Sequence, residues 1–265
     1  MPSKRAAEVK RRLQAGEVVL SAWLTFDSPA VAEVIAGTGF DILLIDFEHT
    51  SLSLETLERA LASVARWDPV TIVRVPGHDA ALIKRVLDIG ADGIIAPMVM
   101  DADQARGIVA AVKYPPFGRR GYGPRRASDY FRNRSYFAEA NDRTFVIVQI
   151  EHPDAASRAA EIAAVAGIDV ICQGPADMAV NLGHFGEPDH PMVEAAIEAV
   201  FAAARHAGLP VCMGRYEPAA DQLGLVARGA RFVIASDDLV VLRNGLTMHL
   251  DAARQALAAS PGTRT

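Results

Sequence analysis

Short apolar runs rich in valine, isoleucine and leucine recur at intervals along the chain. Each run is apolar on both faces, which is typical of strands buried in a parallel sheet rather than of strands with one face in water. Eight such runs can be distinguished, at 18–24, 41–46, 70–75, 93–98, 144–150, 169–174, 209–214 and 231–236. The pattern therefore predicts eight buried parallel strands.

Between these runs, apolar residues recur with helical spacing in segments rich in alanine and leucine, and several of these segments end in glycine. Eight strands that alternate with helices predict the α/β class and a (β/α)8 TIM barrel. A doubly wound open sheet is the alternative, but the segment LTFDSPA after the first strand lacks its glycine-rich phosphate turn. The expected helices are about 3–15, 29–39, 54–66, 80–91, 101–113, 154–167, 190–208, 217–230 and 237–260.

No linker rich in proline, glycine or serine divides the chain, so one TIM-barrel domain is expected over residues 1–265, with a flexible tail at about 258–265. Two segments depart from an evenly spaced barrel. Residues 114–142 are rich in Arg, Tyr and Gly and too long for a plain connection, which predicts a lid at the carboxyl ends of the strands. The helix at 237–260 is apolar in its first half, which predicts packing against another subunit.

Composition narrows the possible partners. The net charge of −5 comes from interspersed acids and bases, so neither nucleic acid nor an anionic membrane is expected. No apolar run reaches the roughly 18 residues of a membrane span, and no apolar stretch follows the basic N-terminal segment as it would in a signal peptide. Cys172 and Cys212 lie in strand-like runs and are expected to be buried free thiols, which indicates the cytoplasm.

In a barrel of this kind, catalytic groups lie at the carboxyl ends of the strands. Several predicted strands carry polar side chains there. They are Asp46, Glu48 and His49 after the second strand, Arg74 on the third, Gln149 and Glu151 on the fifth, Asp177 after the sixth, and Ser236, Asp237 and Asp238 on the eighth.

Glu151 and Asp177 follow neighbouring strands, so a barrel brings them to the same rim. Two carboxylates suit a hard divalent ion such as Mg²⁺ or Mn²⁺, which keeps positions open for water and substrate oxygens. The seven histidines are scattered, and no cluster of His or Cys with zinc spacing is evident. The alternative is that Glu151 is a solvated loop residue and Asp177 a helix cap.

Arg74 lies inside a strand, where burial of its charge is unfavourable unless it meets an anion. It is expected either to bind a substrate carboxylate or enolate oxygen, or to form a structural salt bridge in the barrel mouth. His49 fits a general base oriented by a neighbouring acid, or an ordinary loop histidine. The segment GPAD at 174–177 places backbone N–H groups at a helix start, where a carboxylate can bind.

Five segments then occur in order: GFDILLIDFEHTSLSLETL, TIVRVPGHDAALIKRVLDIGADGIIAPMVMDADQA, KYPPFGRRGYGP, VIVQIEHPDAA and GPADMAVNLG. With them the chain resembles the HpcH/HpaI aldolase family of class II pyruvate aldolases from about residue 15 to 245. The resemblance implies a metal-dependent barrel that cleaves a 4-hydroxy-2-oxo acid to pyruvate and an aldehyde, or joins them, through a metal-stabilised enolate. It also implies a homo-trimer or homo-hexamer, often with the last helix exchanged between subunits.

The resemblance assigns roles to the polar residues of the rim. Glu151 and Asp177 would bind Mg²⁺, Mn²⁺ or Co²⁺, and Arg74 would contact the keto oxygen that becomes the enolate. His49 would be the acid and base, with Asp46 nearby.

Further roles follow from the same resemblance. Asp88 would reach the catalytic histidine across a subunit interface. Gln149, Gly174, Ala176 and Asp177 would bind substrate, with the backbone amides of the last two holding its carboxylate.

Four residues depart from the family pattern: Phe47 stands where glycine is common, Gln173 where a small or apolar residue is usual, and Met178 and Ala179 where the family commonly has Leu and Ser after GPAD. These departures bear on substrate choice more than on the metal chemistry. None of the four lysines ends a predicted strand, which argues against a Schiff-base aldolase. The remaining alternatives are a related 2-oxo acid lyase, such as an oxaloacetate-type decarboxylase, and a barrel that binds a carboxylate without catalysis.

Overall fold

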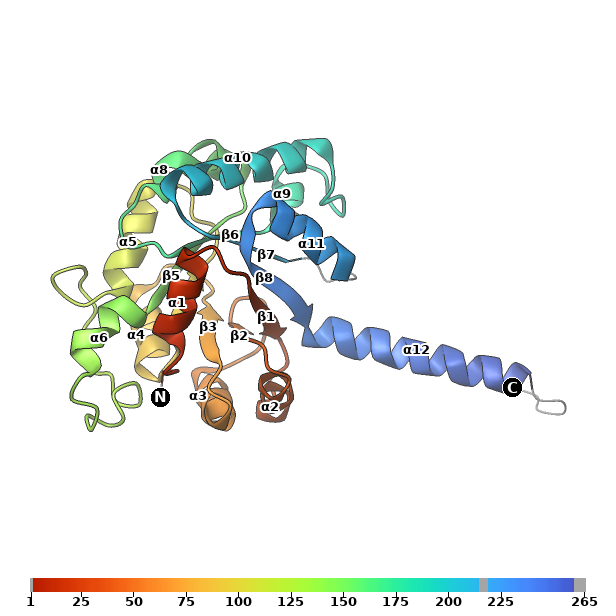
Figure 1. Cartoon of the computed structure of the whole chain (residues 1–265), viewed down its shortest axis with the longest axis horizontal. Coiled ribbons are helices and arrows are strands. Elements are labelled where there is room, and N and C mark those ends of the chain that lie inside the picture. Colours follow the sequence, from red (N-terminus) through yellow and green to blue (C-terminus); the bar gives the residue numbers. More distant parts are fainter. Residues whose placement is uncertain (1, 215–218, 260–265) are drawn as a thin grey trace.

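The computed structural model describes residues 2–214 and 219–259, in which eight parallel strands close into a barrel in chain order (Figure 1). Strand β8 pairs with β1 and completes the ring. The predicted TIM barrel and its eight strands are confirmed. They are β1 (Val19–Leu24), β2 (Ile42–Asp46), β3 (Val70–Arg74), β4 (Gly93–Ala96), β5 (Phe145–Ile150), β6 (Val170–Gln173), β7 (Val211–Gly214) and β8 (Ala230–Asp237).

Helices surround the barrel close to the predicted positions, with three differences. The helix expected at 154–167 is two short helices, because the backbone of Arg158 leaves helical geometry at φ −107°. Helices α6 and α9 were not predicted. The helices are α1 (Ala6–Gln14), α2 (Pro29–Gly37), α3 (Leu54–Ser63) with the 3₁₀ turn η1 (Val64–Arg66), α4 (Ala80–Asp88), α5 (Ala102–Val112), α6 (Tyr136–Arg143), α7 (Pro153–Ser157), α8 (Ala159–Ala163), α9 (Pro175–Asn181), α10 (Pro191–Ala207), α11 (Ala219–Arg228) and α12 (Asp238–Ala258).

The apolar residues of the strands form two layers. Alternate residues fill the barrel interior, and the others pack under the helices. Ala6, Val9 and Leu13 of α1 join the interior layer, so α1 closes the amino end of the barrel. Cys172 and Cys212 are buried and free, as predicted. With its interior filled, the barrel leaves only its carboxyl end open for a site.

The prediction of a lid over the carboxyl ends is wrong for residues 114–142. Helix α5 first carries the chain back from β4, so the segment that follows lies at the amino ends of the strands, beside α4 and α6 (Figure 1). Arg120 forms a buried ion pair with Asp88 at the end of α4 (Nη2–Oδ1 2.6 Å), and Arg126 donates to the carbonyl of Ile89 (2.8 Å). These contacts are structural.

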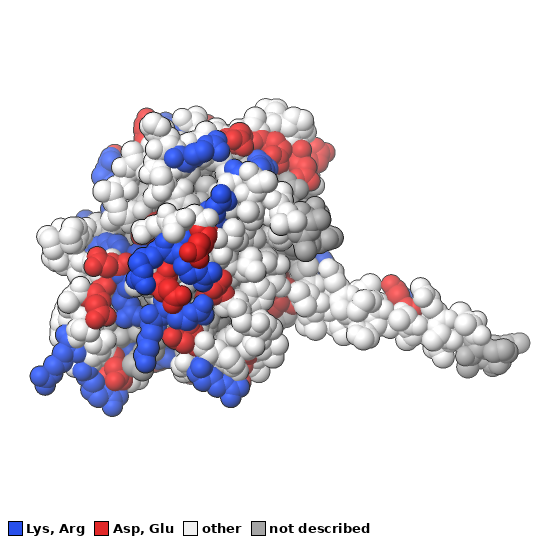
Figure 2. Space-filling view, viewed as in Figure 1, with Lys and Arg blue, Asp and Glu red and all other residues white. Residues whose placement is uncertain are grey.

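Helix α12 leaves the barrel after β8 and extends away from it (Figure 1). Its start is fixed by Asp238, which accepts hydrogen bonds from the backbone and hydroxyl of Thr25 (3.0 and 2.6 Å). No residue of α12 is buried, and its surface in Figure 2 is mostly neither acidic nor basic. The tail expected at about 258–265 lies outside the described residues from position 260 onward. None of the described helices is both long and apolar enough to cross a membrane.

Asp92 is a buried acid at the amino end of β4. It accepts hydrogen bonds from the backbone of Ser3 (2.7 Å) and from the backbone and hydroxyl of Thr71 (both 2.9 Å). Burial raises the pKa of Asp92 from 3.8 to about 7, although these hydrogen bonds oppose the rise. The folded protein therefore keeps a proton on Asp92 at pH values where the unfolded chain releases it.

We expect this proton to give the protein a stability that falls as pH rises from about 4 to about 7, with a slope of up to about 1.4 kcal/mol per unit from Asp92 alone. Asp92→Asn should remove that part of the slope. The measurement is chemical unfolding across this pH range, with the exposed Asp103→Asn as control. Equal slopes in the two variants would contradict the assignment.

Candidate active site

Arg74 and Asp46 form the link between β2 and β3 at the carboxyl rim. The two residues are paired in the sheet register, and Arg74 Nε and Nη2 each lie 2.9 Å from an oxygen of the buried Asp46 carboxylate. Such a bidentate ion pair fixes the orientation of the guanidinium plane. The structural salt bridge foreseen for Arg74 is therefore present.

The same guanidinium also faces the open end of the barrel. Its Nε lies 3.2 Å from Glu48 Oε2, its carbon Cζ lies 4.7 Å from the ring centre of Trp23, and Arg74 lines a cavity. Among the described residues, none accepts a hydrogen bond from its Nη1. The ion pair therefore leaves donor capacity for a ligand.

His49 is largely exposed, and its nearest acid is Glu48 rather than Asp46, which is committed to Arg74. The distance from His49 Nε2 to Glu48 Oε2 is 3.5 Å. Burial raises the pKa of Glu48, and the charges of Asp46 and of Asp177 add to the rise, while Arg74 and His49 oppose it. From the sequence, either Asp46 or Glu48 could be the acid beside His49, because spacing does not show which of them meets the ring.

Glu151 lies just past β5 and is almost wholly buried, at 2% exposure, so it is not a solvated loop residue. Its carboxylate accepts hydrogen bonds from the backbone N–H of Met98 (2.8 Å) and from the side-chain amide of Gln149. Burial, together with the negative charges of Asp177 and Glu48, raises the pKa of Glu151 to about 7, although the hydrogen bonds from Met98 and Gln149 oppose the rise. Three acids thus share this rim.

Gly174, which follows β6, packs directly against this carboxylate. A Cβ on Gly174 would lie 2.3 Å from Glu151 Oε2 and 2.9 Å from Gln149 Nε2. Only glycine therefore lets Glu151 occupy its position. Three residues on, Asp177 lies in the first turn of α9, so β5 and β6 bring the predicted pair to one rim.

A cavity of about 350 Å³ opens at this rim. The four predicted substrate-binding residues contribute to it, but of the predicted catalytic residues only Arg74 does, and Glu151, packed against Gln149 and Gly174, does not line it. The cavity is lined by Trp23, Arg74, Gln149, Cys172, Gln173, Gly174, Pro175, Ala176, Asp177, Pro188, Asp189, Gly214 and Ile234.

Asp88 is not brought to His49 within one chain. It ends α4, which runs from the carboxyl rim back to the amino end of the barrel, and there it pairs with Arg120. A role for Asp88 at the rim therefore requires a second subunit, as the resemblance implies.

Gln173, the departure from the family pattern, ends β6 and borders the cavity. It is buried, yet neither its amide oxygen nor its nitrogen has a hydrogen-bond partner among the described residues. An unpaired buried amide costs about 1–3 kcal/mol. A polar group of a ligand or a water molecule would relieve that cost.

One expectation about histidine is wrong. His184, Glu187 and His190 offer ligand atoms within 4.8 Å of one another, in the loop between α9 and α10. The two histidines are separated by five residues, a spacing that zinc ligands can have, but no cysteine pair accompanies them, so the sequence did not reveal the cluster.

The fold and the acidic rim define a barrel enzyme of the class that works with a divalent cation. The chain belongs to the HpcH/HpaI aldolase/citrate lyase family, whose family model matches residues 20–245. This is a family of metal-dependent class II aldolases and lyases.

Comparisons with known proteins agree with this membership. A 4-hydroxy-2-oxo-heptane-1,7-dioate aldolase of Salmonella paratyphi C (strain RKS4594) is 41% identical over 239 residues, 89% of this chain and 90% of that protein. An HpcH/HpaI aldolase structure from Desulfitobacterium hafniense DCB-2 has a TM-score of 0.89 at 30% identity and covers 97% of this chain and 99% of that one. The citrate synthase SbnG has a TM-score of 0.85 at 29% identity and covers 94% and 98%.

We expect Gly174→Ala to destabilise the folded protein by about 1–3 kcal/mol, because the new methyl group must displace the Glu151 carboxylate. Gly107→Ala is the control, since a Cβ there meets nothing within 4 Å. Chemical unfolding of both variants measures the difference. A Gly174→Ala protein as stable as the control would show that the close approach is not a constraint.

Proposed function

We propose that the chain is a divalent-metal-dependent aldolase that cleaves 4-hydroxy-2-oxo acids to pyruvate and an aldehyde, or catalyses the reverse addition. The observation that carries the proposal is the mutual repulsion of Glu48, Glu151 and Asp177 at the rim of a cavity that Asp177 and Arg74 line. The names of the relatives support the same reaction class.

Glu151 and Asp177 fit a divalent cation and would hold it. The buried Glu151 carboxylate has a pKa of about 7, and the neighbouring acids raise rather than lower that pKa, so a cation would relieve their repulsion. The donors are all oxygen, which suits Mg²⁺, Mn²⁺ or Co²⁺. When bound, such an ion supplies Lewis-acid polarisation of the oxygens of a 2-oxo acid.

Arg74 would stabilise the negative charge that develops on the keto oxygen of the substrate. Cleavage of the bond between C3 and C4 leaves an electron pair that becomes negative charge on this oxygen. Asp46 and Trp23 hold the guanidinium in one orientation before the reaction begins. Preorganised donors of this kind contribute about 3–4 kcal/mol each to lowering a barrier.

His49 would take the proton from the 4-hydroxyl group of the substrate. Glu48 lies beside it and would stabilise the protonated imidazole. Asp46 acts through Arg74 as a positioning residue. Asp88 of a neighbouring subunit would be a second acidic partner for His49, since no path within one chain brings them together.

The substrate carboxylate would lie against the backbone amides of Ala176 and Asp177, in the first turn of α9. Gln149 and Gly174 form the adjoining wall of the cavity. The partners are thus a 2-oxo acid and an aldehyde, and the buried free thiols support a cytoplasmic location.

Helix α12 supports the proposal of a homo-trimer or homo-hexamer with exchanged helices. Five leucines on it are each at least 44% exposed. With a rotation of 100° per residue about the helix axis, these leucines form one stripe along the helix. In water such a stripe is stabilised by packing against another apolar surface. The leucines are Leu239, Leu242, Leu246, Leu250 and Leu257.

The reaction is tested by measuring pyruvate release from a set of 4-hydroxy-2-oxo acids with Mg²⁺, Mn²⁺ or Co²⁺. For Glu151→Gln we expect turnover to fall at least about a hundred-fold, because the cation loses a charged ligand. The surface variant Glu161→Gln should match the wild type.

Oxaloacetate serves as a separate arm of this experiment. Release of CO₂ from oxaloacetate without cleavage of any hydroxy-oxo acid would favour the decarboxylase alternative. Unchanged turnover in Glu151→Gln would refute the assignment of Glu151 as a metal ligand.

We expect Leu246→Glu to shift the protein to smaller species in sedimentation velocity, because a charge in the leucine stripe opposes its burial between subunits. Gln255→Glu adds the same charge on the opposite side of α12 and should keep the wild-type assembly. Identical sedimentation of the two variants would argue against assembly through the stripe.

A further inference from the structure

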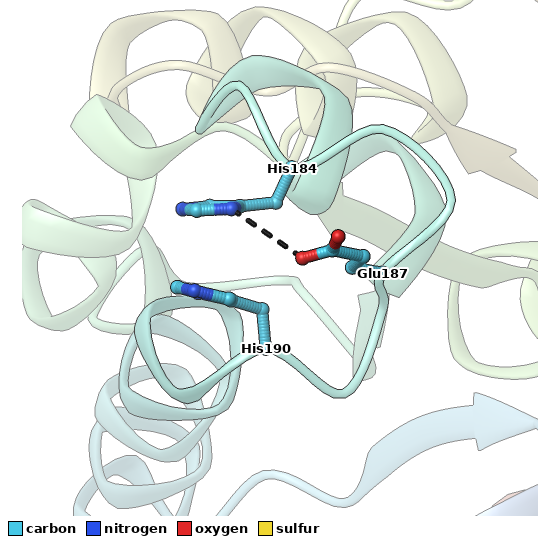
Figure 3. A group of neighbouring side chains, drawn as sticks. All are labelled: His184, Glu187 and His190. Atoms are coloured by element: carbon cyan, nitrogen blue, oxygen red, sulfur yellow. Dashed lines mark ion pairs between the residues drawn. The ribbon is translucent and has the colours of Figure 1, made fainter.

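The loop between α9 and α10 carries a second group of metal-type ligands that is separate from the acidic rim. His184, Glu187 and His190 are three residues apart, and the backbone closes a turn at each step: Glu187 N–H donates to the carbonyl of His184 and His190 N–H to that of Glu187, both at 3.0 Å. These repeated turns bring the three side chains together on one side of the loop (Figure 3).

We propose that these three residues form a binding site for one late-transition divalent ion, with Zn²⁺ as the representative case. Two imidazoles and one carboxylate are a mixed nitrogen and oxygen set that favours Zn²⁺, Ni²⁺ or Cu²⁺ over Mg²⁺. Three such ligands leave a fourth position for water. The all-oxygen rim at Glu151 and Asp177 has the opposite preference.

The side chains differ in how firmly they are held. His190 Nδ1 accepts a hydrogen bond from the backbone N–H of Met192 at the start of α10 (3.3 Å), so the neutral ring carries its proton on Nε2 and its lone pair on Nδ1. An ion would therefore bind His190 through Nδ1 and replace the contact with Met192. His184 has a looser contact, with Nδ1 3.7 Å from Glu187 Oε2.

The stacking of the two rings determines what must move on binding. Their centres are 3.4 Å apart and their planes 16° from parallel, so an ion cannot lie in both ring planes at once. Since both rings must point a lone pair at the ion, they turn about their side-chain bonds and unstack as it binds. The ligand atoms lie within 4.8 Å of one another, so a small contraction brings all three to bond distances of about 2.0–2.2 Å from one ion.

The position of the loop gives this site a consequence for the cavity. Pro188 and Asp189 lie between two of the ligands and border the cavity. An ion that ties Glu187 to His190 therefore restrains one wall of the cavity without contacting the acidic rim.

The test is a Zn²⁺ titration by calorimetry in saturating Mg²⁺, which occupies the acidic rim. The wild type is expected to bind one Zn²⁺ per chain that Mg²⁺ does not displace. In His184→Ala and in Glu187→Gln the affinity for this ion should fall at least about ten-fold. His206→Ala removes an exposed histidine elsewhere on α10 and should bind as the wild type does.

Histidine ring NMR provides a readout independent of the variants. Zn²⁺ should shift the ring signals of His184 and His190 and leave His206 unchanged. Equal Zn²⁺ affinity in wild type and both loop variants, or ring signals of these two histidines that do not respond, would overturn the proposal. Glu187 is exposed, so its variant keeps the test valid if His184→Ala proves unstable.

Discussion

The rim of this barrel depends on one constraint, which is the burial of the Glu151 carboxylate. It is nearly inaccessible to water, and two further acids raise its pKa. Glu151 stays in place because Met98 donates a hydrogen bond to it and because Gly174 has no side chain to displace it. Negative charge gathered in this way needs a proton or a cation beside it. The packing that ends β5 and β6 therefore already determines the kind of chemistry the cavity supports.

Arg74 shows that structural and catalytic interpretations of one residue need not compete. Its ion pair with Asp46 joins β2 to β3, and the same pair aims the guanidinium at the cavity. Removing Arg74 would leave the buried charge of Asp46 uncompensated, at a cost of about 3–5 kcal/mol, whereas Arg74 without Asp46 would keep Glu48 at 3.2 Å. The rigidity that holds the strands together is thus the rigidity that a charge-stabilising donor requires.

Much of the fold was predictable, because eight runs that are apolar on both faces leave few architectures open. The position of residues 114–142 was not predictable. A segment that directly follows a strand lies at the carboxyl end of the barrel, whereas one that follows a helix lies at the amino end, and helix α5 precedes this segment. Helix α9 has only seven residues, too few for its periodicity to be read. At the rim, strand ends predicted Glu151, Asp177 and Arg74. Which of Asp46 and Glu48 meets His49, and the cluster around His184, depend on backbone turns that residue spacing does not show.

The proposed exchange of helix α12 between subunits would make the order of this helix dependent on protein concentration. The helix has 21 residues and no buried side chain, so it lacks the packing within one chain from which most helical stability in proteins comes. In the proposed assembly that packing comes from other copies, so dilution would be a structural perturbation. A very dilute sample should lose helical signal from the C-terminal segment while the barrel, whose core lies within one chain, stays folded.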